Sequence, residues 1–235
     1  RSVVNRSLNY LTETRRQREA YRGTWLPEPL VYDAHVQTEA QLDLSYSFML
    51  LLEKLTPTER AVFILKESFE VDYQELAEML ASNETNCRQL YHRAREKMAN
   101  PKKRFVFDKE QHLQLLETFT KASETGDITD FIQLLKEDIA VYSDGGGKVS
   151  AALHPLFGKT VVEKFLRGLA QKGFPHFTLK PVIVNGSMAF LIFNRHTQQL
   201  ETVLIIEAGD AGISDLYFVR NPDKLEHLDP IFRKM

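Results

Sequence analysis

The stretch Val71–Met98 constrains the fold most, because it is typical of two helices joined by a tight corner. Over Asp72–Ala81 the apolar residues have a mostly helical spacing, and Ala77 is small where a second helix would cross. The corner follows at once, with Ser82 or Asn83 as the candidate N-cap of the second helix. In that helix the apolar residues recur at one-face helical spacing: Cys87, Leu90, Tyr91, Ala94 and Met98.

The opposite face of the second helix carries side chains of the kinds that reach base edges and phosphates in a DNA major groove. These are Thr85, Arg88, Gln89, His92 and Arg93, and further along Arg95 and Lys97 are placed for phosphate. This is the helix-turn-helix layout, in which the second helix enters the groove and the first one braces it. The alternative is an ordinary helical hairpin whose polar face is simply solvated.

A strong helix start precedes this pair. Thr56 is a candidate cap, Pro57 occupies the first helical position and Glu59 the third. The strings LTPTERAVFIL, DYQELAEML and CRQLYHRAREKM together resemble region 4 of the bacterial sigma-70 superfamily, especially its extracytoplasmic-function (ECF) type, over Leu42–Met98. The resemblance implies that this region binds the upstream (−35) promoter element and core RNA polymerase. The chain departs from the family at Ala81–Ser82, where glycine and an aliphatic residue are usual.

The charge distribution agrees with a nucleic-acid partner for one segment only. Residues 85–104 hold seven basic residues against one glutamate, a net of +6, whereas residues 26–84 hold twelve acidic residues against three basic ones, a net of −9. A basic strip that begins in the second helix is typical of phosphate contact. The acidic stretch before it suits a protein partner better.

The remaining composition excludes several classes of protein. The single cysteine, Cys87, rules out an internal disulfide framework or a cysteine zinc cluster and fits the reducing cytoplasm. No apolar run approaches the ~18 residues of a membrane span, and no signal peptide is visible. We therefore expect no membrane contact, no metal and no cofactor. Because the first residue is Arg rather than Met, we also expect a piece of a longer chain.

The amino-terminal part is predicted to be a helix followed by a linker. Ser2–Gln17 has helical spacing, and the prolines of Tyr21–Leu30 favour an extended segment. The chain's only tryptophan, Trp25, is expected to be docked there, because an exposed linker rarely keeps so large an apolar surface. The string WLPEP resembles the linker of ECF sigma factors that carry a SnoaL-like extension, the SigJ-like group. This implies a remnant of sigma region 2 (residues 1–20), a linker (21–36) and region 4 (37–100).

The carboxy-terminal part has a different pattern. Asn100–Pro101 ends the recognition helix and 102–104 form a basic hinge; helices are predicted at Gln111–Thr125, Ile128–Lys136 and Val161–Lys172. Strands are predicted at Ile139–Ser143, Phe177–Val184, Met188–Asn194, Thr202–Ala208 and Ile213–Arg220, with hairpin turns at Asn185–Gly186 and 209–212. The predicted fold is multidomain: an all-α helix-turn-helix domain, then an α+β domain over 106–235 that resembles the SnoaL-like (NTF2-like) cone.

Three strings in this chain resemble the sigma-linked group: one resembles its linker, and two resemble parts of its cone domain. They are Trp25, Leu26, Pro27, Glu28 and Pro29 in the linker; Asp144, Gly145, Gly146, Gly147 and Lys148 after a strand; and Asn221, Pro222, Asp223, Lys224 and Leu225 near the end. We expect the three to meet, so that the cone domain holds the linker. A phosphate loop is the other interpretation of DGGGK, but the Walker spacing is lacking, and a tight turn accounts for three glycines.

Catalysis is the remaining alternative, since small isomerases and cyclases share the cone fold. Candidate acids and bases are Asp144, His154, His176, His196 and Asp215. No two of them have a recognised catalytic or metal spacing, and a fold does not imply a function. We therefore expect no catalytic residue and predict a sigma factor fragment whose SnoaL-like domain modulates its activity. The alternatives are a regulator whose cone senses a small ligand, marked by a large apolar cavity, and a cone-fold enzyme, marked by two convergent titratable groups in that cavity.

Overall fold

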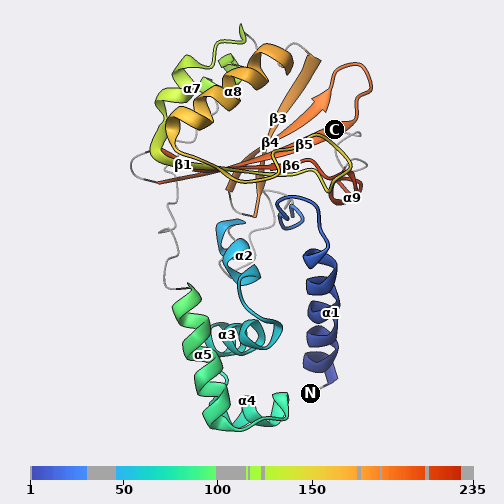
Figure 1. Cartoon of the computed structure of the whole chain (residues 1–235), viewed down its shortest axis with the longest axis vertical. Helices are drawn as coiled ribbons and strands as arrows, with labels where there is room; N and C mark the ends of the chain where they lie inside the picture. The colour runs from blue at the N-terminus through green and yellow to red at the C-terminus, as the bar shows by residue number, and fades with distance from the viewer. Residues whose placement is uncertain are drawn as a thin grey trace. The chain divides into compact units, whose positions relative to one another are not determined.

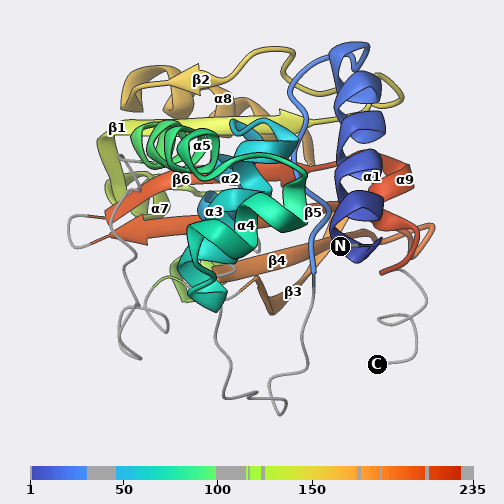
Figure 2. The same cartoon turned by 90° about the horizontal axis from the view of Figure 1, so that it is seen from below.

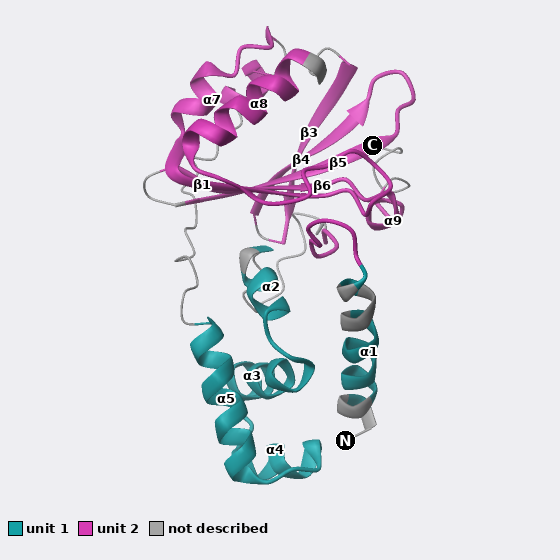
Figure 3. Ribbon diagram, viewed as in Figure 1, with its two compact units in different colours: residues 1–20, 39–102 teal, residues 21–38, 103–235 magenta. Residues whose placement is uncertain are grey.

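The structure is a computed structural model that describes residues 2–30, 46–98, 115, 117–122, 125–173, 176–185, 187–209 and 212–228. The chain divides into two compact units, one of residues 1–20 with 39–102 and one of residues 21–38 with 103–235 (Figure 3). Linker residues from Tyr21 onward thus belong to the second unit rather than to the helical one. The basic hinge at 102–104 and the start of the predicted region 4 at 37–45 lie outside the described residues.

Helices make up the described part of the first unit. They are α1 (Ser2–Glu19), α2 (Tyr46–Glu53), α3 (Pro57–Phe69), α4 (Tyr73–Leu80) and α5 (Glu84–Met98). Two small apolar clusters join α3 to α4 and α5: Val62, Leu76, Ala77 and Cys87 form one, and Leu55, Phe63, Ala94 and Met98 form the other. The apolar stripe predicted for α5 is therefore its buried side.

Local capping explains where these helices begin and end. Thr56 Oγ1 accepts from the Glu59 backbone N–H at 3.2 Å while Glu59 accepts from the Thr56 N–H at 2.8 Å, a complete capping box. Asn83, not Ser82, caps α5, since its Oδ1 accepts from the Asn86 N–H at 2.8 Å. At the corner, Ala81 adopts a left-handed conformation with φ of 50°. A non-glycine residue here carries a steric cost that glycine would avoid.

Helix α1 is joined to α2 by an ion pair and also lies against α3 and α4. Glu53 forms an ion pair with Arg18 of α1 and accepts from Arg60 Nη1 of α3 at 3.1 Å. Burial, together with the neighbouring Arg60 charge, lowers the pKa of Arg18 to about 10. Two guanidinium groups thus share one partly buried carboxylate at this junction.

The second unit is a curved mixed sheet with helices on one face (Figure 1). Its strands are β1 (Leu135–Asp144), β2 (Leu156–Phe157), β3 (Phe177–Val184), β4 (Ser187–Asn194), β5 (Leu200–Gly209) and β6 (Gly212–Val219). The strand order is β2-β1-β6-β5-β4-β3, as Figure 2 shows. Strands β3 to β6 form the predicted antiparallel meander, whereas β1 returns parallel to β6.

Helices α7 (Thr129–Gln133) and α8 (Lys159–Gly173) cover one face of this sheet, and α9 (Pro222–Leu225) follows β6. A single core fills the space between the helices and the sheet, with Phe119, Phe131, Phe190, Leu204 and Leu216 among its buried members. Of the predicted helix Gln111–Thr125, residues 111–114, 116 and 123–124 lie outside the described part. The rest of that helix contributes Leu115, Phe119 and Ala122 to the core.

The prediction of a helix over Ile128–Lys136 is wrong in its second half. Helix α7 ends at Gln133, and Leu135 already pairs with Ile213 of β6, whose N–H donates to the Leu134 carbonyl at 2.7 Å. Gly212 permits this pairing, since a Cβ there would lie 2.3 Å from the Leu134 oxygen. Sheet pairing across the chain therefore overrides the helical spacing of the segment. The two-residue strand β2 was also not predicted.

We expect Thr56→Ala to destabilise the helical unit by about 0.5–2 kcal/mol, because the α3 cap loses its side-chain acceptor. The measurement is urea unfolding followed by the helical circular dichroism of the chain. Thr58→Ala is the matched control, since Thr58 lies in the same turn and its side chain makes no hydrogen bond to the described residues. Equal unfolding midpoints for the two variants would contradict the capping role.

Candidate DNA-binding surface and linker contact

Every residue predicted to contact DNA lies on the exposed side of α5. Thr85, Arg88, Gln89, His92, Arg93, Arg95 and Lys97 are all exposed, whereas Cys87, Ala94 and Met98 are buried. Of these, Thr85, Arg88, Gln89 and His92, which we call the recognition face, follow one another at helical spacing. The side chains that could read bases are thus presented together, next to the capped N-terminus of the helix.

Local contacts orient Arg88 on this face. Its Nη2 donates to Glu84 Oε2 at 3.1 Å, and its guanidinium lies 4.2 Å from the centre of the Tyr73 ring on α4. Both contacts are exposed, so each contributes little energy and can be exchanged for a base or a phosphate. His92 similarly lies 3.6 Å from Glu96 one turn later.

Lys97 differs from its neighbours. It donates at 2.6 Å to Glu59 Oε2, the carboxylate that completes the α3 capping box, and Glu59 is 3% exposed. Burial alone would raise the pKa of Glu59, but the hydrogen bonds from Lys97 and Thr56 outweigh it and the pKa is lowered. Lys97 therefore joins α5 to α3 in addition to any part in phosphate contact, a structural role that its spacing did not reveal.

In the second unit, the three strings noted in the linker, after β1 and after β6 meet at one buried carboxylate. Asp144 is fully buried at the end of β1, and each of its oxygens accepts two hydrogen bonds. Oδ1 accepts from the Tyr21 hydroxyl at 2.5 Å and the Gly146 N–H at 3.0 Å. Oδ2 accepts from the Leu26 N–H at 2.8 Å and from Lys224 Nζ at 2.7 Å. Linker, glycine loop and α9 each supply a donor.

Lys224 is the cationic partner of this carboxylate, and its side chain is only 7% exposed. Besides Asp144 it donates to the Leu26 carbonyl at 2.5 Å, so both backbone polar groups of Leu26 are bonded. The Lys224 ammonium also lies 4.1 Å from the centre of the Trp25 ring and 5.0 Å from that of Tyr21. We call the set Tyr21, Trp25, Leu26, Asp144, Asn221 and Lys224 the latch.

Tyr21 and Asn221 complete the latch. The Asn221 amide donates to the Tyr21 hydroxyl at 2.8 Å, and that hydroxyl in turn donates to Asp144. Burial, followed by the hydrogen bond to the Asp144 carboxylate, raises the pKa of Tyr21, so this phenol stays a neutral donor. Gly146 has φ of 63°, and a Cβ on it would come within 2.7 Å of the Asn221 amide. Glycine is thus required there for close approach.

The other residues of the three strings surround the latch. Pro27 and Pro29 are buried, Glu28 is exposed, and Pro222 begins α9, whose Leu225 is buried. A Cβ on Gly147 would lie 3.2 Å from Arg22, and one on Gly145 would overlap the Val149 carbonyl. Lys148 and Asp223 form an exposed ion pair at 2.7 Å.

Two neighbouring linker residues differ in burial. Leu26 is fully buried, whereas Trp25 is half-buried.

A second linker contact was not predicted. Leu30 and Asn185, in the β3–β4 turn, exchange two hydrogen bonds: the Leu30 N–H donates to Asn185 Oδ1 at 3.0 Å and the Asn185 N–H donates to the Leu30 carbonyl at 3.1 Å. Asn185 has φ of 53°, as the predicted hairpin turn requires. The Asn-Gly pair at 185–186 was the signal in the sequence, and it indicated a turn rather than a partner for the linker.

The candidate acids and bases do not converge. Asp144 belongs to the latch, His154 is exposed in a loop, and Asp215 is buried and accepts from Ser214 Oγ at 2.8 Å. The rings of His176 and His196 lie 6.2 Å apart, and both side chains are exposed. No cluster of three metal-binding side chains, and no helix with the length and apolar character to cross a bilayer, is found in the described ranges.

The helical unit and the α+β unit together define a class of protein. Residues 45–98 match the family model described as sigma-70, region 4. Over most of its length the chain is similar to ECF RNA polymerase sigma factors, and the part that follows region 4 is an α+β domain.

Two mycobacterial sigma factors are among the similar proteins. The chain is 29% identical over 237 residues to the ECF RNA polymerase sigma factor SigJ of Mycobacterium tuberculosis, covering 95% of this chain and 76% of that relative. It is 28% identical to the probable ECF sigma factor SigI of the same species, covering 79% of this chain and 61% of the relative. The crystal structure of M. tuberculosis SigJ matches with a TM-score of 0.68 at 28% identity, over 88% of this chain and 76% of that one.

We expect Asp144→Asn to lower the free energy of opening of the latch by about 3–5 kcal/mol, because it leaves the buried Lys224 ammonium without its counter-charge. Hydrogen–deuterium exchange of the Leu26 and Leu30 amides, with proteolysis across residues 20–35, measures the opening. Asp223→Asn is the control, since it breaks an exposed ion pair worth no more than about 1 kcal/mol. Equal exchange in the two variants would show that Asp144 does not hold the linker.

Proposed function

We propose that the recognition face of α5 binds the major groove of the upstream (−35) promoter element, with Arg93 and Arg95 beside it on phosphates. The observation that carries this proposal is the exposure of every predicted contact residue on the second helix of a region 4 domain. The capped N-terminus of α5 adds a favourable dipole for phosphate. Lys97 contributes less, because Glu59 already neutralises it.

The same proposal includes core RNA polymerase as the second partner. Residues 26–84, which precede α5, carry the acidic excess of the chain, and a segment of that sign suits a protein better than DNA. A protein that acts with RNA polymerase has to be in the cytoplasm. The chain's one cysteine, Cys87, is a buried free thiol, which agrees with that reducing compartment.

We further propose that the α+β domain modulates activity through the latch and has no catalytic role of its own. The linker is bonded at Leu26 and again at Leu30, and it joins the segment assigned to region 2 to region 4. A segment held at two points has fewer conformations than a free one, so the latch restricts the spacing available to the two DNA-binding regions. That spacing has to match the spacing of the promoter elements. The domain boundaries at residues 20, 36, 100 and 106 belong to this proposal.

The DNA-binding proposal predicts a specific pattern among α5 variants. In selection from a pool of randomised duplexes, Arg88→Ala should bind the enriched sequence about 1–3 kcal/mol more weakly and lose selectivity at one position. Arg93→Ala should weaken binding to all duplexes evenly and reduce the salt dependence by about one phosphate contact.

Lys121→Ala is the control, because that exposed lysine lies in the other unit. Two results would contradict the assigned face: unchanged selectivity of Arg88→Ala, or a loss in the Lys121→Ala variant equal to that of Arg88→Ala.

The latch proposal predicts an effect on transcription that is separate from DNA affinity. In the full-length gene product with core polymerase, Trp25→Ala and Asp144→Asn should lower output from a cognate promoter severalfold, because the linker is no longer restrained. Both variants should bind the selected duplex as tightly as the parent, and Asp223→Asn should behave as the parent in both assays. Normal output from a variant whose linker has become protease-sensitive would show that the latch is not regulatory.

A further inference from the structure

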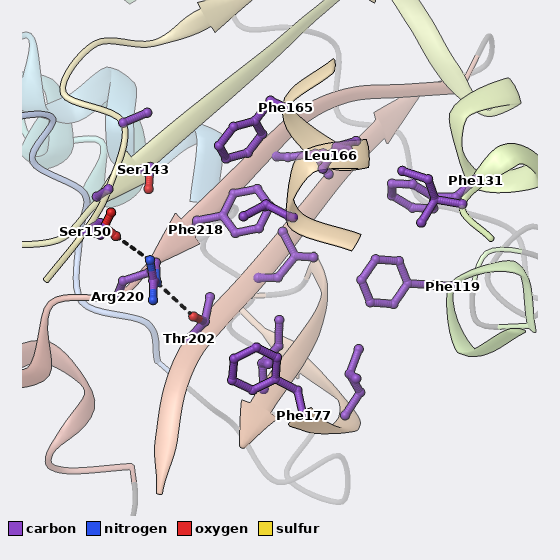
Figure 4. Close-up of a pocket in the computed structure, with 18 residues that line it drawn as sticks. Phe119, Phe131, Ser143, Ser150, Phe165, Leu166, Phe177, Thr202, Phe218 and Arg220 are labelled. Atoms are coloured by element: carbon purple, nitrogen blue, oxygen red, sulfur yellow. Dashed lines mark hydrogen bonds between the residues drawn. The ribbon is translucent and has the colours of Figure 1, made fainter. Parts of the chain in front are cut away.

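The second unit contains an apolar cavity of about 510 Å³, between the sheet and the helices that cover it (Figure 4). This volume lies within the range of about 300–1,000 Å³ that is usual for small-molecule sites. Five phenylalanines contribute to the lining: Phe119, Phe131, Phe165, Phe177 and Phe218. None of the three strings that meet at the latch contributes a lining residue among those the structure describes.

One end of the cavity is polar. Figure 4 shows Arg220 there with Ser143, Ser150 and Thr202, while Phe119 and Phe131 lie at the far side. Arg220 donates to the Ser150 carbonyl and, from Nε at 3.3 Å, to Thr202 Oγ1. These two bonds fix the guanidinium and leave its Nη2 without a partner in the described part of the chain. The Ser143 hydroxyl, 4% exposed, likewise has no such partner.

The charge at this end is not compensated. No carboxylate of the described residues lies within ion-pair distance of Arg220, and both of its hydrogen-bond acceptors are neutral. Every other lining residue that the structure describes is uncharged. An unpaired cation beside apolar surface attracts an anion more strongly than it would in water, because the local dielectric constant is lower.

We propose that this cavity binds an amphipathic monocarboxylate, with its carboxylate on Arg220 and its hydrocarbon body among the phenylalanines. A guanidinium binds a carboxylate with two parallel hydrogen bonds, for which Nη1 and Nη2 each keep a free N–H. Ser143 and Thr202 can donate to the same group. One cation matches one carboxylate, whereas a phosphate dianion would leave a charge unpaired. The aromatic far side offers the body of the ligand no hydrogen-bond donors.

The wild-type chain allows a first test that needs no variant. Decanoate, decanol and decyltrimethylammonium share a hydrocarbon chain and differ in the charge of the head group. In isothermal titration calorimetry below their micellar concentrations, decanoate should bind to one site about tenfold or more tightly than decanol, and decyltrimethylammonium should bind least. Equal affinities of decanoate and decanol, or no saturable decanoate binding, would overturn the proposal.

Three variants locate the site. Arg220→Gln should reduce decanoate affinity to that of decanol while leaving decanol binding unchanged, which also shows that the variant is folded. Leu169→Trp, which places a larger side chain on the α8 wall of the cavity, should weaken both ligands. Arg167→Gln is the matched control, because that arginine is exposed on α8 and pairs with Glu163. Decanoate binding that survives both Arg220→Gln and Leu169→Trp would place the ligand elsewhere and refute the proposal.

Discussion

The attachment of the linker to the α+β unit is centred on one buried charge, the Asp144 carboxylate. A fully buried carboxylate is stable only if its lone pairs are satisfied, and here four donors from the linker, the glycine loop and the end of the chain do so. The oxygens of one side chain thus bring together Leu26 and Lys224, which are 198 residues apart in sequence. Breaking any of these contacts leaves a polar group unpaired in the interior, so the latch favours one geometry strongly over partial ones.

The latch and the cavity are built from neighbouring residues of β1 and of the segment that follows β6. Ser143 precedes Asp144 on β1, and Arg220 precedes Asn221 after β6; in each pair the first residue lines the cavity and the second belongs to the latch. On β1, the alternation of side chains along a strand accounts for this division. The Arg220 N–H donates to the Asp144 carbonyl at 2.7 Å, so the two sites also share a backbone hydrogen bond.

Much of the architecture was predictable because it is encoded locally. Capping residues and helical spacing predicted α3, α4 and α5, and the predicted hairpin turns separate β3 from β4 and β5 from β6. The exposed side of α5 follows from the same spacing. What could not be predicted depends on contacts between distant segments: the parallel return of β1, which truncates α7; the Lys97–Glu59 ion pair; and the bonds between Leu30 and Asn185. The meeting of the three strings at Asp144 was expected, whereas the contact of the Lys224 ammonium with the Trp25 ring was not.

The burial of the latch has a consequence for how the chain responds to ionic strength. Mobile ions screen charges that face water, with a Debye length of about 8 Å at physiological salt, and they screen a desolvated pair such as Asp144–Lys224 much less. The recognition helix, by contrast, presents its arginines to solvent, and phosphate binding weakens steeply as counterions accumulate. On the proposed function, a rise in salt concentration weakens the binding of α5 to DNA, while the hydrogen bonds between the linker and Asp144 persist. The proposed DNA contact and the latch therefore differ in their response to salt.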